Sequence, residues 1–218
     1  MLLRADFGLR VVVTPAQYEW VPSPVAGVER MMLDRVGGEV ARATSIVRYA
    51  PDSRYPPHEH GGGEEILVLE GEFTDEHGRY PKGSYLRNPI GTSHRPSVGP
   101  DGATIFVKLH QFDASDSRQA VIDTNSGDWQ ATRADGVLQL PLHEHGCEQV
   151  ALIRFEPNTT YPSHVHEGGE EIFVLSGEIR DEAGDYPQGS WMRFPDGSEH
   201  EVSSGADGAV LYVKSGHL

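Results

Sequence analysis

The chain consists of short apolar runs separated by closely spaced turn residues. Runs of strand length lie at 65–69, 84–87 and 103–109, with proline and glycine between them. Runs of this length and composition are typical of antiparallel strands, and the acidic turn within GEFTDEHGRYPKG, residues 71–83, predicts a hairpin. Gly71, Gly83, Gly177 and Gly189 are expected to supply turn conformations with positive φ. The pattern therefore predicts an all-β fold, a sandwich or barrel of many short strands.

The second half of the chain repeats the first. Residues 48–112 align without a gap onto residues 154–218, and about half of the aligned positions are identical. Apolar runs at 10–13 and 119–122 also correspond, so each is expected to form a strand that opens its own unit. The sequence thus predicts two domains, residues 1–112 and 113–218.

Each repeat carries two histidines, a glutamate and a distant third histidine at a constant offset, 164 − 58 = 106. Residues two apart on a strand share a face, so His58 and His60 lie about 6.6 Å apart and can reach one ion. Glu64 has the same parity, which favours it over Glu65 as a ligand, and His94 closes the set from a distant strand. Imidazole and carboxylate are common ligands of zinc and related ions. The predicted metal ligands are His58, His60, Glu64, His94, His164, His166, Glu170 and His200.

Other histidines are interpreted differently. The HEHGCE segment contains a further pair, His143 and His145, but the first repeat has no histidines at the corresponding positions. His77, His110 and His217 also have no corresponding histidine in the other repeat, and they are expected to be solvated. The alternative for all the histidines is that they are surface residues of an acidic protein, and the duplicated pattern argues against it for the six histidines among the predicted ligands.

The net charge and the cysteine content exclude several classes of partner and of metal site. A formal net charge of −15 excludes a nucleic-acid backbone or an anionic membrane surface as a partner, because these need clustered lysine and arginine. Cys147 is the single cysteine, so neither an intrachain disulfide nor a thiolate zinc site is expected. No signal-peptide pattern and no apolar stretch of about 20 residues is present. We expect a cytoplasmic protein.

The repeated segments resemble the two motifs of the cupin superfamily. The first, HxHxxxExxxxxxG, ends at Gly71 and again at Gly177; the second, GxxxxxPxGxxH, ends at His94 and again at His200. This resemblance implies a bicupin, a tandem duplicated jelly-roll β-barrel in which each cupin domain holds one divalent ion through three histidines and a glutamate.

Residues 62–97 are also similar to the cupin domain of the anti-sigma factor ChrR. That resemblance implies zinc and a role as a regulator or sensor in an extracytoplasmic-function sigma-factor response to singlet oxygen and organic hydroperoxides, with a sigma factor as protein partner. ChrR proteins bind the sigma factor through a separate N-terminal zinc domain with an HxxxCxxC motif. The residues before Trp20 lack this motif.

The metal and the activity stay open at this stage. Zinc is the metal expected first, and four protein ligands would complete its tetrahedral coordination. Six-coordinate iron, manganese or nickel would keep two coordination positions open for dioxygen and a chelating substrate. The alternative function is therefore a metal-dependent dioxygenase acting on a small diketone or phenolic substrate; a third is a structural module. No catalytic residue beyond the ligands is evident. A small-molecule ligand in the barrels and a homo-oligomer are both compatible with the sequence.

Residues around the two predicted sites differ between the repeats. Asn88 corresponds to Phe194, and the third histidine is flanked by serine and arginine in the first repeat but by glutamates in the second. The sites are therefore either inequivalent, one functional and one structural, or changed by drift alone. Three repeated pairs are further candidates for lining the pockets: Tyr55 and Tyr161, Tyr80 and Tyr186, Arg87 and Arg193. The alternative for the tyrosines is packing in the core or at the rim, and for the arginines it is pairing with Asp75 and Asp181 or with other acidic neighbours.

Overall fold

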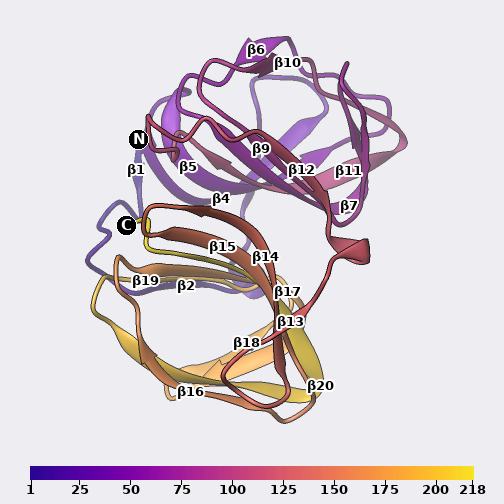
Figure 1. The fold of residues 1–218 in the computed structure, drawn as a ribbon. Helices are drawn as coiled ribbons and strands as arrows, with labels where there is room; N and C mark the ends of the chain where they lie inside the picture. The colour runs from indigo at the N-terminus through magenta and orange to yellow at the C-terminus, as the bar shows by residue number, and fades with distance from the viewer. The chain divides into compact units, whose positions relative to one another are not determined.

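The computed structural model describes residues 1–218 and is almost entirely β-structure, which confirms the predicted fold class. The chain forms two compact units, each a set of curved strands (Figure 1). Unit 1 comprises Met1–Ala5 and Glu19–Gly127, and unit 2 comprises Asp6–Tyr18 and Asp128–Leu218. The helical elements are two single turns, η1 (Pro15–Gln17) and η2 (Thr124–Ser126). The structure offers no helix with the length and apolarity that crossing a membrane requires.

Unit 1 is built on one nine-stranded antiparallel sheet with the order β1-β4-β5-β11-β7-β9-β12, to which β3 and β8 add at β4 and β7. A separate two-stranded sheet joins β6 to β10. The strands are β1 (Leu2–Leu3), β3 (Trp20–Pro22), β4 (Val28–Gly37), β5 (Ala41–Tyr49), β6 (His58–Glu59), β7 (Glu64–Thr74), β8 (Arg79–Pro81), β9 (Ser84–Asn88), β10 (Ser93–His94), β11 (Ser97–Leu109) and β12 (Ala120–Asp123).

Unit 2 repeats this topology with the order β13-β14-β15-β20-β17-β19-β2, to which β16 and β18 add at β20 and β17. Its strands are β2 (Val11–Val13), β13 (Gln130–Ala131), β14 (Val137–His145), β15 (Glu148–Phe155), β16 (Thr160–Val165), β17 (Glu170–Asp181), β18 (Gly184–Pro187), β19 (Trp191–Phe194) and β20 (Glu199–Ser215). Strand β20 is continuous where unit 1 has β10 and β11. The interruption in unit 1 falls at Pro96, which lacks the N–H that a continuous ladder would use.

The opening strands are exchanged between the units, so the prediction that each belongs to its own unit is wrong. Strand β2 pairs with β19 of unit 2, with Trp191 opposite Val13, and β12 pairs with β9 of unit 1, with Arg87 opposite Ala120. A simple cut at residue 112 therefore does not describe the compact units. Sequence correspondence identified both strands but could not show which sheet edge each one joins, because the two edges are themselves copies.

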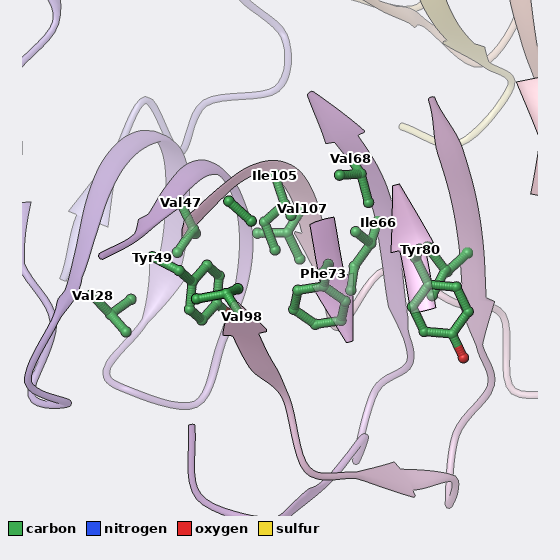
Figure 2. Close-up of a cluster of buried hydrophobic side chains, with 12 residues drawn as sticks. Val28, Val47, Tyr49, Ile66, Val68, Phe73, Tyr80, Val98, Ile105 and Val107 are labelled. Carbon is green, nitrogen blue, oxygen red and sulfur yellow. The ribbon is translucent and has the colours of Figure 1, made fainter. Parts of the chain in front are cut away.

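The core of unit 1 is a cluster of aliphatic and aromatic side chains inside the curved sheet (Figure 2). Phe73 is 1% exposed and its ring lies edge-on to Tyr49, at 5.8 Å between centroids. Ile66 and Val68 point into this core from β7. Their neighbour Leu67, on the opposite face, is buried as well, which explains why this strand reads as a continuous apolar run.

The hairpin predicted at residues 71–83 is present, with Glu72 opposite Pro81 in the β7–β8 pair. The four glycines expected to need positive φ have values of 69°, 88°, 73° and 88°. A Cβ atom on Gly71 would collide with the carbonyl oxygen of Gly102, and a Cβ atom on Gly177 would collide with that of Gly208. These glycines are therefore structural, because only glycine adopts this backbone without strain at such close approach.

Candidate metal centres

The four predicted ligand residues of unit 1 lie together at one end of the sheet. Strand β6 supplies His58 and leads directly to His60, Glu64 is the first residue of β7, and His94 ends β10. The β6–β10 pair sets His94 opposite His58. One ligand atom from each of the four residues lies within 4.8 Å of the others. The sequence pattern thus folds into a single cluster, and the binding of an ion there stays a prediction.

The rings in this cluster are oriented by oxygens outside it. Each Nδ1 contacts one such atom: His58 the carbonyl of Pro56 at 3.1 Å, His60 the hydroxyl of Thr92 at 2.8 Å, and His94 the Asp75 carboxylate at 3.2 Å. An Nδ1 atom that donates outward leaves Nε2 as the unprotonated nitrogen facing inward. Outer partners of this kind fix metal-binding histidines in the required tautomer.

The inward-facing atoms have the arrangement that a cation would satisfy. Nε2 of His60 and of His94 are buried and have no hydrogen-bond partner, although each lies 3.2 Å from Glu64 Oε2. Asn88 Nδ2 donates to the same oxygen at 3.1 Å. Buried polar atoms are rarely left unpaired. Three nitrogens and a carboxylate around one point therefore fit a divalent metal ion.

Unit 2 brings the corresponding residues together. Strand β16 sets His164 opposite His200, and one ligand atom from each of the four residues again lies within 4.8 Å of the others. His166 Nε2 and His200 Nε2 are buried without a hydrogen-bond partner, 3.5 and 3.8 Å from Glu170 Oε1. Nδ1 of His166 contacts Ser198 Oγ at 3.0 Å. The second set also fits a divalent ion, in a looser arrangement.

The two centres differ most in the carboxylate behind the third histidine. Asp181, the counterpart of Asp75, lies 3.9 Å from His200 Nδ1 and is instead bound by Arg10 at 2.6 Å. Arg10 belongs to the N-terminal segment of unit 2, and its guanidinium lies 5.1 Å from the Phe194 ring centroid. In unit 1 the Asp75 carboxylate therefore orients His94, whereas in unit 2 the corresponding Asp181 carboxylate is neutralised by Arg10.

Phe194 also changes the surroundings of the ligand residues in unit 2. The phenylalanine occupies the position of Asn88, and its ring packs on His166 and His200 at centroid distances of 5.3 and 4.5 Å. Glu170 therefore lacks the amide donor that Glu64 has. The contacts around the two clusters therefore differ, and the choice between inequivalent sites and drift stays a prediction to be tested.

These contacts shift the pKa values of the two carboxylates in opposite directions. Burial alone would raise the pKa of Glu64, but the three histidines that surround its carboxylate outweigh burial and hold that pKa well below its usual range. Burial raises the pKa of Glu170 to about 8. Burial and then neighbouring imidazoles lower the pKa of His166 to about 3, and burial first lowers that of His200 to about 4. Without metal, the unit 2 centre is thus a set of largely neutral groups at neutral pH.

Each cluster opens into a cavity of its own unit. In unit 2 a cavity of about 430 Å³ is lined by all four ligand residues together with Tyr161 and neutral side chains of β14 and β15. In unit 1 a cavity of about 310 Å³ is lined by His58, His60 and Glu64, with Tyr55 beside them. Tyr55 and Tyr161 pack edge-on against the first histidine, at centroid distances of 5.2 and 5.1 Å. These two tyrosines therefore line the pockets.

The other repeated candidates take structural positions. Tyr80 donates to Asp75 Oδ1 at 3.1 Å, and Tyr186 to Asp181 Oδ1 at 2.7 Å, so both tyrosines support the outer carboxylates. Arg87 is fully buried and pairs with Glu65 and Asp116 rather than with Asp75. Glu65 lies on the opposite face from Glu64, as the strand alternation predicted.

Among the remaining histidines, one prediction is wrong. His217 is not solvated: its side chain is 2% exposed, and Nε2 lies 3.3 Å from Glu171. The turn at Gly216 returns the chain end to β17, with backbone hydrogen bonds to Gly168 and Gly169, and this return was not visible in the apolar pattern. His77 is exposed as expected. His143 and His145 lie on β14 and belong to neither four-residue cluster.

Sequence reasoning missed several contributors to the centres. The sequence suggests Asp75 and Asp181 only as alternative partners of the repeated arginines, and a role behind a histidine could be inferred only from the hairpin geometry. Arg10 carried no signal because its strand was assigned to the other unit. Cys147 lines the unit 2 cavity. Its position in the sequence, away from the metal-ligand motifs, gave no indication of this.

Comparison with protein families assigns both repeats to one family. The family described as the ChrR cupin-like domain matches residues 9–113 and again residues 117–218. The chain belongs to this family. It is therefore a bicupin of the ChrR cupin-like type, as its motifs predicted, while a comparison with curated proteins found no match.

Solved structures share the bicupin fold at low sequence identity. A candidate dioxygenase from Nostoc punctiforme aligns with a TM-score of 0.80 and 17% identity, covering 97% of this chain and 84% of its own. YlbA from Escherichia coli gives 0.73 and 15%, covering 96% and 92%. A deletion mutant of oxalate decarboxylase OxdC from Bacillus subtilis gives 0.68 and 13%, covering 94% and 76%. At this identity the likeness establishes the fold alone.

Proposed function

We propose that this bicupin is a metal-dependent enzyme of the dioxygenase type that acts on a small chelating molecule such as a diketone or phenol. The observation that carries the proposal is that each ligand cluster borders a cavity, of about 430 Å³ in unit 2 and about 310 Å³ in unit 1. Cavities of this size accept small molecules. A purely structural site would have no need of such an opening beside its ligands.

The roles of the residues follow from their contacts. The three histidines and the glutamate of each unit would hold the ion, and a six-coordinate Fe(II), Mn(II) or Ni(II) would offer two positions for dioxygen and substrate. Asp75 and Thr92 keep the rings of His94 and His60 turned toward that point. Tyr55 closes the side of the pocket next to His58. The fold thus supplies orientation and a partly enclosed pocket, and no further nucleophile or base is required.

The test begins with metal content by elemental analysis of protein purified without a metal-binding tag. The protein is then reconstituted with Fe(II), Mn(II) or Ni(II), and oxygen uptake is followed with acetylacetone or catechol as probe. We expect uptake that depends on substrate and that is lost in Glu64→Ala or Glu170→Ala, according to which unit is active. Two tightly held zinc ions per chain, with no oxygen uptake under any reconstitution, would overturn the proposal.

A second function is favoured by the family match itself. In this alternative the bicupin is a cytoplasmic zinc-bound sensor that reports singlet oxygen or organic hydroperoxides through a sigma-factor pathway. Treatment with tert-butyl hydroperoxide should then change protease sensitivity or the binding of a partner without catalytic turnover. An unchanged digestion pattern together with continuous oxygen uptake would exclude this function in favour of the enzyme.

A further inference from the structure

The cavity of unit 1 contains cationic side chains that its counterpart lacks. Besides the metal-ligand residues, Arg30 and Arg35 line it, and both come from β4. In unit 2 the residue that corresponds to Arg30 is Gln139 (30 + 109), and no lysine or arginine lines the cavity there. The strand register confirms the equivalence: Arg30 lies opposite Val47, and Gln139 opposite Ile153.

Arg30 points toward the inside of its unit. It shares a face of β4 with Val28, and both Val28 and Val47 belong to the core cluster. Its Nε atom is buried and has no hydrogen-bond partner, while Nη1 donates to Glu39 Oε2 at 3.1 Å. The Arg30 side chain is 18% exposed and that of Glu39 is 68% exposed. An ion pair with so exposed a partner is weak and can exchange for another anion.

Glu39 lies in the turn between β4 and β5, which is longer than the β14–β15 turn because the first repeat has three extra residues between 36 and 40. Arg35 holds this tip by donating to the carbonyl oxygens of Gly38 and Glu39. Gly37, with φ of 132°, allows the tight turn. The other carboxylate at the rim, Glu59, is exposed. Glu39 and Glu59 also line the cavity, but both are exposed, whereas the Arg30 side chain is 18% exposed.

We propose that the unit 1 cavity selects a small anionic molecule, one end of which chelates the metal while a carboxylate at the other end binds Arg30 and displaces Glu39. A guanidinium is the group best suited to a carboxylate, which it can bind through two parallel hydrogen bonds. The unit 2 cavity, with Gln139 at this position, takes an uncharged molecule. This inference rests on the proposed function only in requiring an open metal position.

The experiment uses two probes that share a metal-binding end and differ in charge: butanohydroxamate, and the monohydroxamate of succinic acid. The full-length variant His164→Ala with His166→Ala is loaded with Co(II), so that the visible spectrum reports unit 1 alone. We expect the charged probe to bind at least about tenfold more tightly than the neutral one. Arg30→Gln, which copies unit 2, should abolish that preference, and Glu39→Gln should strengthen it. Arg79→Gln, which removes an exposed arginine elsewhere in unit 1, is the matched control.

The outcomes separate the two proposals. If both hydroxamates change the Co(II) spectrum but Arg30→Gln weakens them equally, or not at all, the anionic selectivity is overturned and the open metal position stands. If neither probe changes the spectrum, the metal position is closed, and both proposals are overturned. The converse variant Gln139→Arg, in a chain with His58→Ala and His60→Ala, should give unit 2 a preference for the charged probe. An unchanged preference there would contradict the role assigned to this position.

Discussion

Replacing Asp75 with asparagine tests whether the outer carboxylate sets metal affinity in unit 1. The carboxylate is buried, with 4% of its side chain exposed, and Oδ2 lies 3.2 Å from His94 Nδ1. Asparagine keeps the oxygen that accepts from the Tyr80 hydroxyl, but it presents an NH₂ group where Nδ1 must donate. His94 would then favour the other tautomer, with the proton on the nitrogen that faces the metal.

The expected magnitude follows from the loss of such an outer partner, which lowers metal affinity by about 10- to 100-fold, or about 1.4 to 2.7 kcal/mol. The matched substitution Asp181→Asn should cost less, because Arg10 already neutralises Asp181 and His200 Nδ1 lies 3.9 Å away. Affinities are measured by competition with a chromophoric chelator in chains that keep one ligand set. Thermal unfolding of the metal-free proteins serves as the control for folding.

Three results would refute this reasoning. If Asp75→Asn leaves the affinity of unit 1 unchanged while the protein stays folded, the aspartate does not orient His94. If Asp75→Asn and Asp181→Asn weaken their sites equally, the difference between the two aspartate contacts has no energetic consequence. A larger loss in unit 2 would likewise contradict the role given to Arg10.

Three further predictions concern other parts of the molecule. Arg10→Gln should raise the metal affinity of unit 2, measured by the same competition, because a freed Asp181 adds a negative charge near the ion. Binding in unit 2 should strengthen by about tenfold per pH unit up to about pH 8 and then level off, since Glu170 must lose a proton to bind; titration calorimetry in two buffers should detect that proton. Phe73→Ala should lower the free energy of unfolding of unit 1 by about 3 to 5 kcal/mol in urea denaturation, with Val121→Ala, at a position 59% exposed, as control.

Sequence alone predicted the parts of this molecule that depend on local pattern. The strand runs, the hairpin after Gly71 and both ligand sets follow from alternation, turn residues and a strict repeat. The pairing partner of β2 could not be predicted, because a strand of three residues carries no information that distinguishes one copy of a sheet edge from another. The burial of His217 depends on a turn after the last strand, and the Arg10–Asp181 pair depends on the pairing of β2 with β19.

The exchanged strands have a consequence for how the chain reaches its final form on the ribosome. Unit 1 can complete its sheet once residues 120–123 have emerged, since these form β12. The segment around Val12 is made 180 residues (192 − 12) before its partner Met192. Translation proceeds at about 5 to 20 residues per second, so this strand waits about 10 to 40 seconds for the sheet edge that it joins. A gene fragment that starts after residue 18 would therefore leave unit 2 with an unpaired edge on β19, exposed to pairing with another chain.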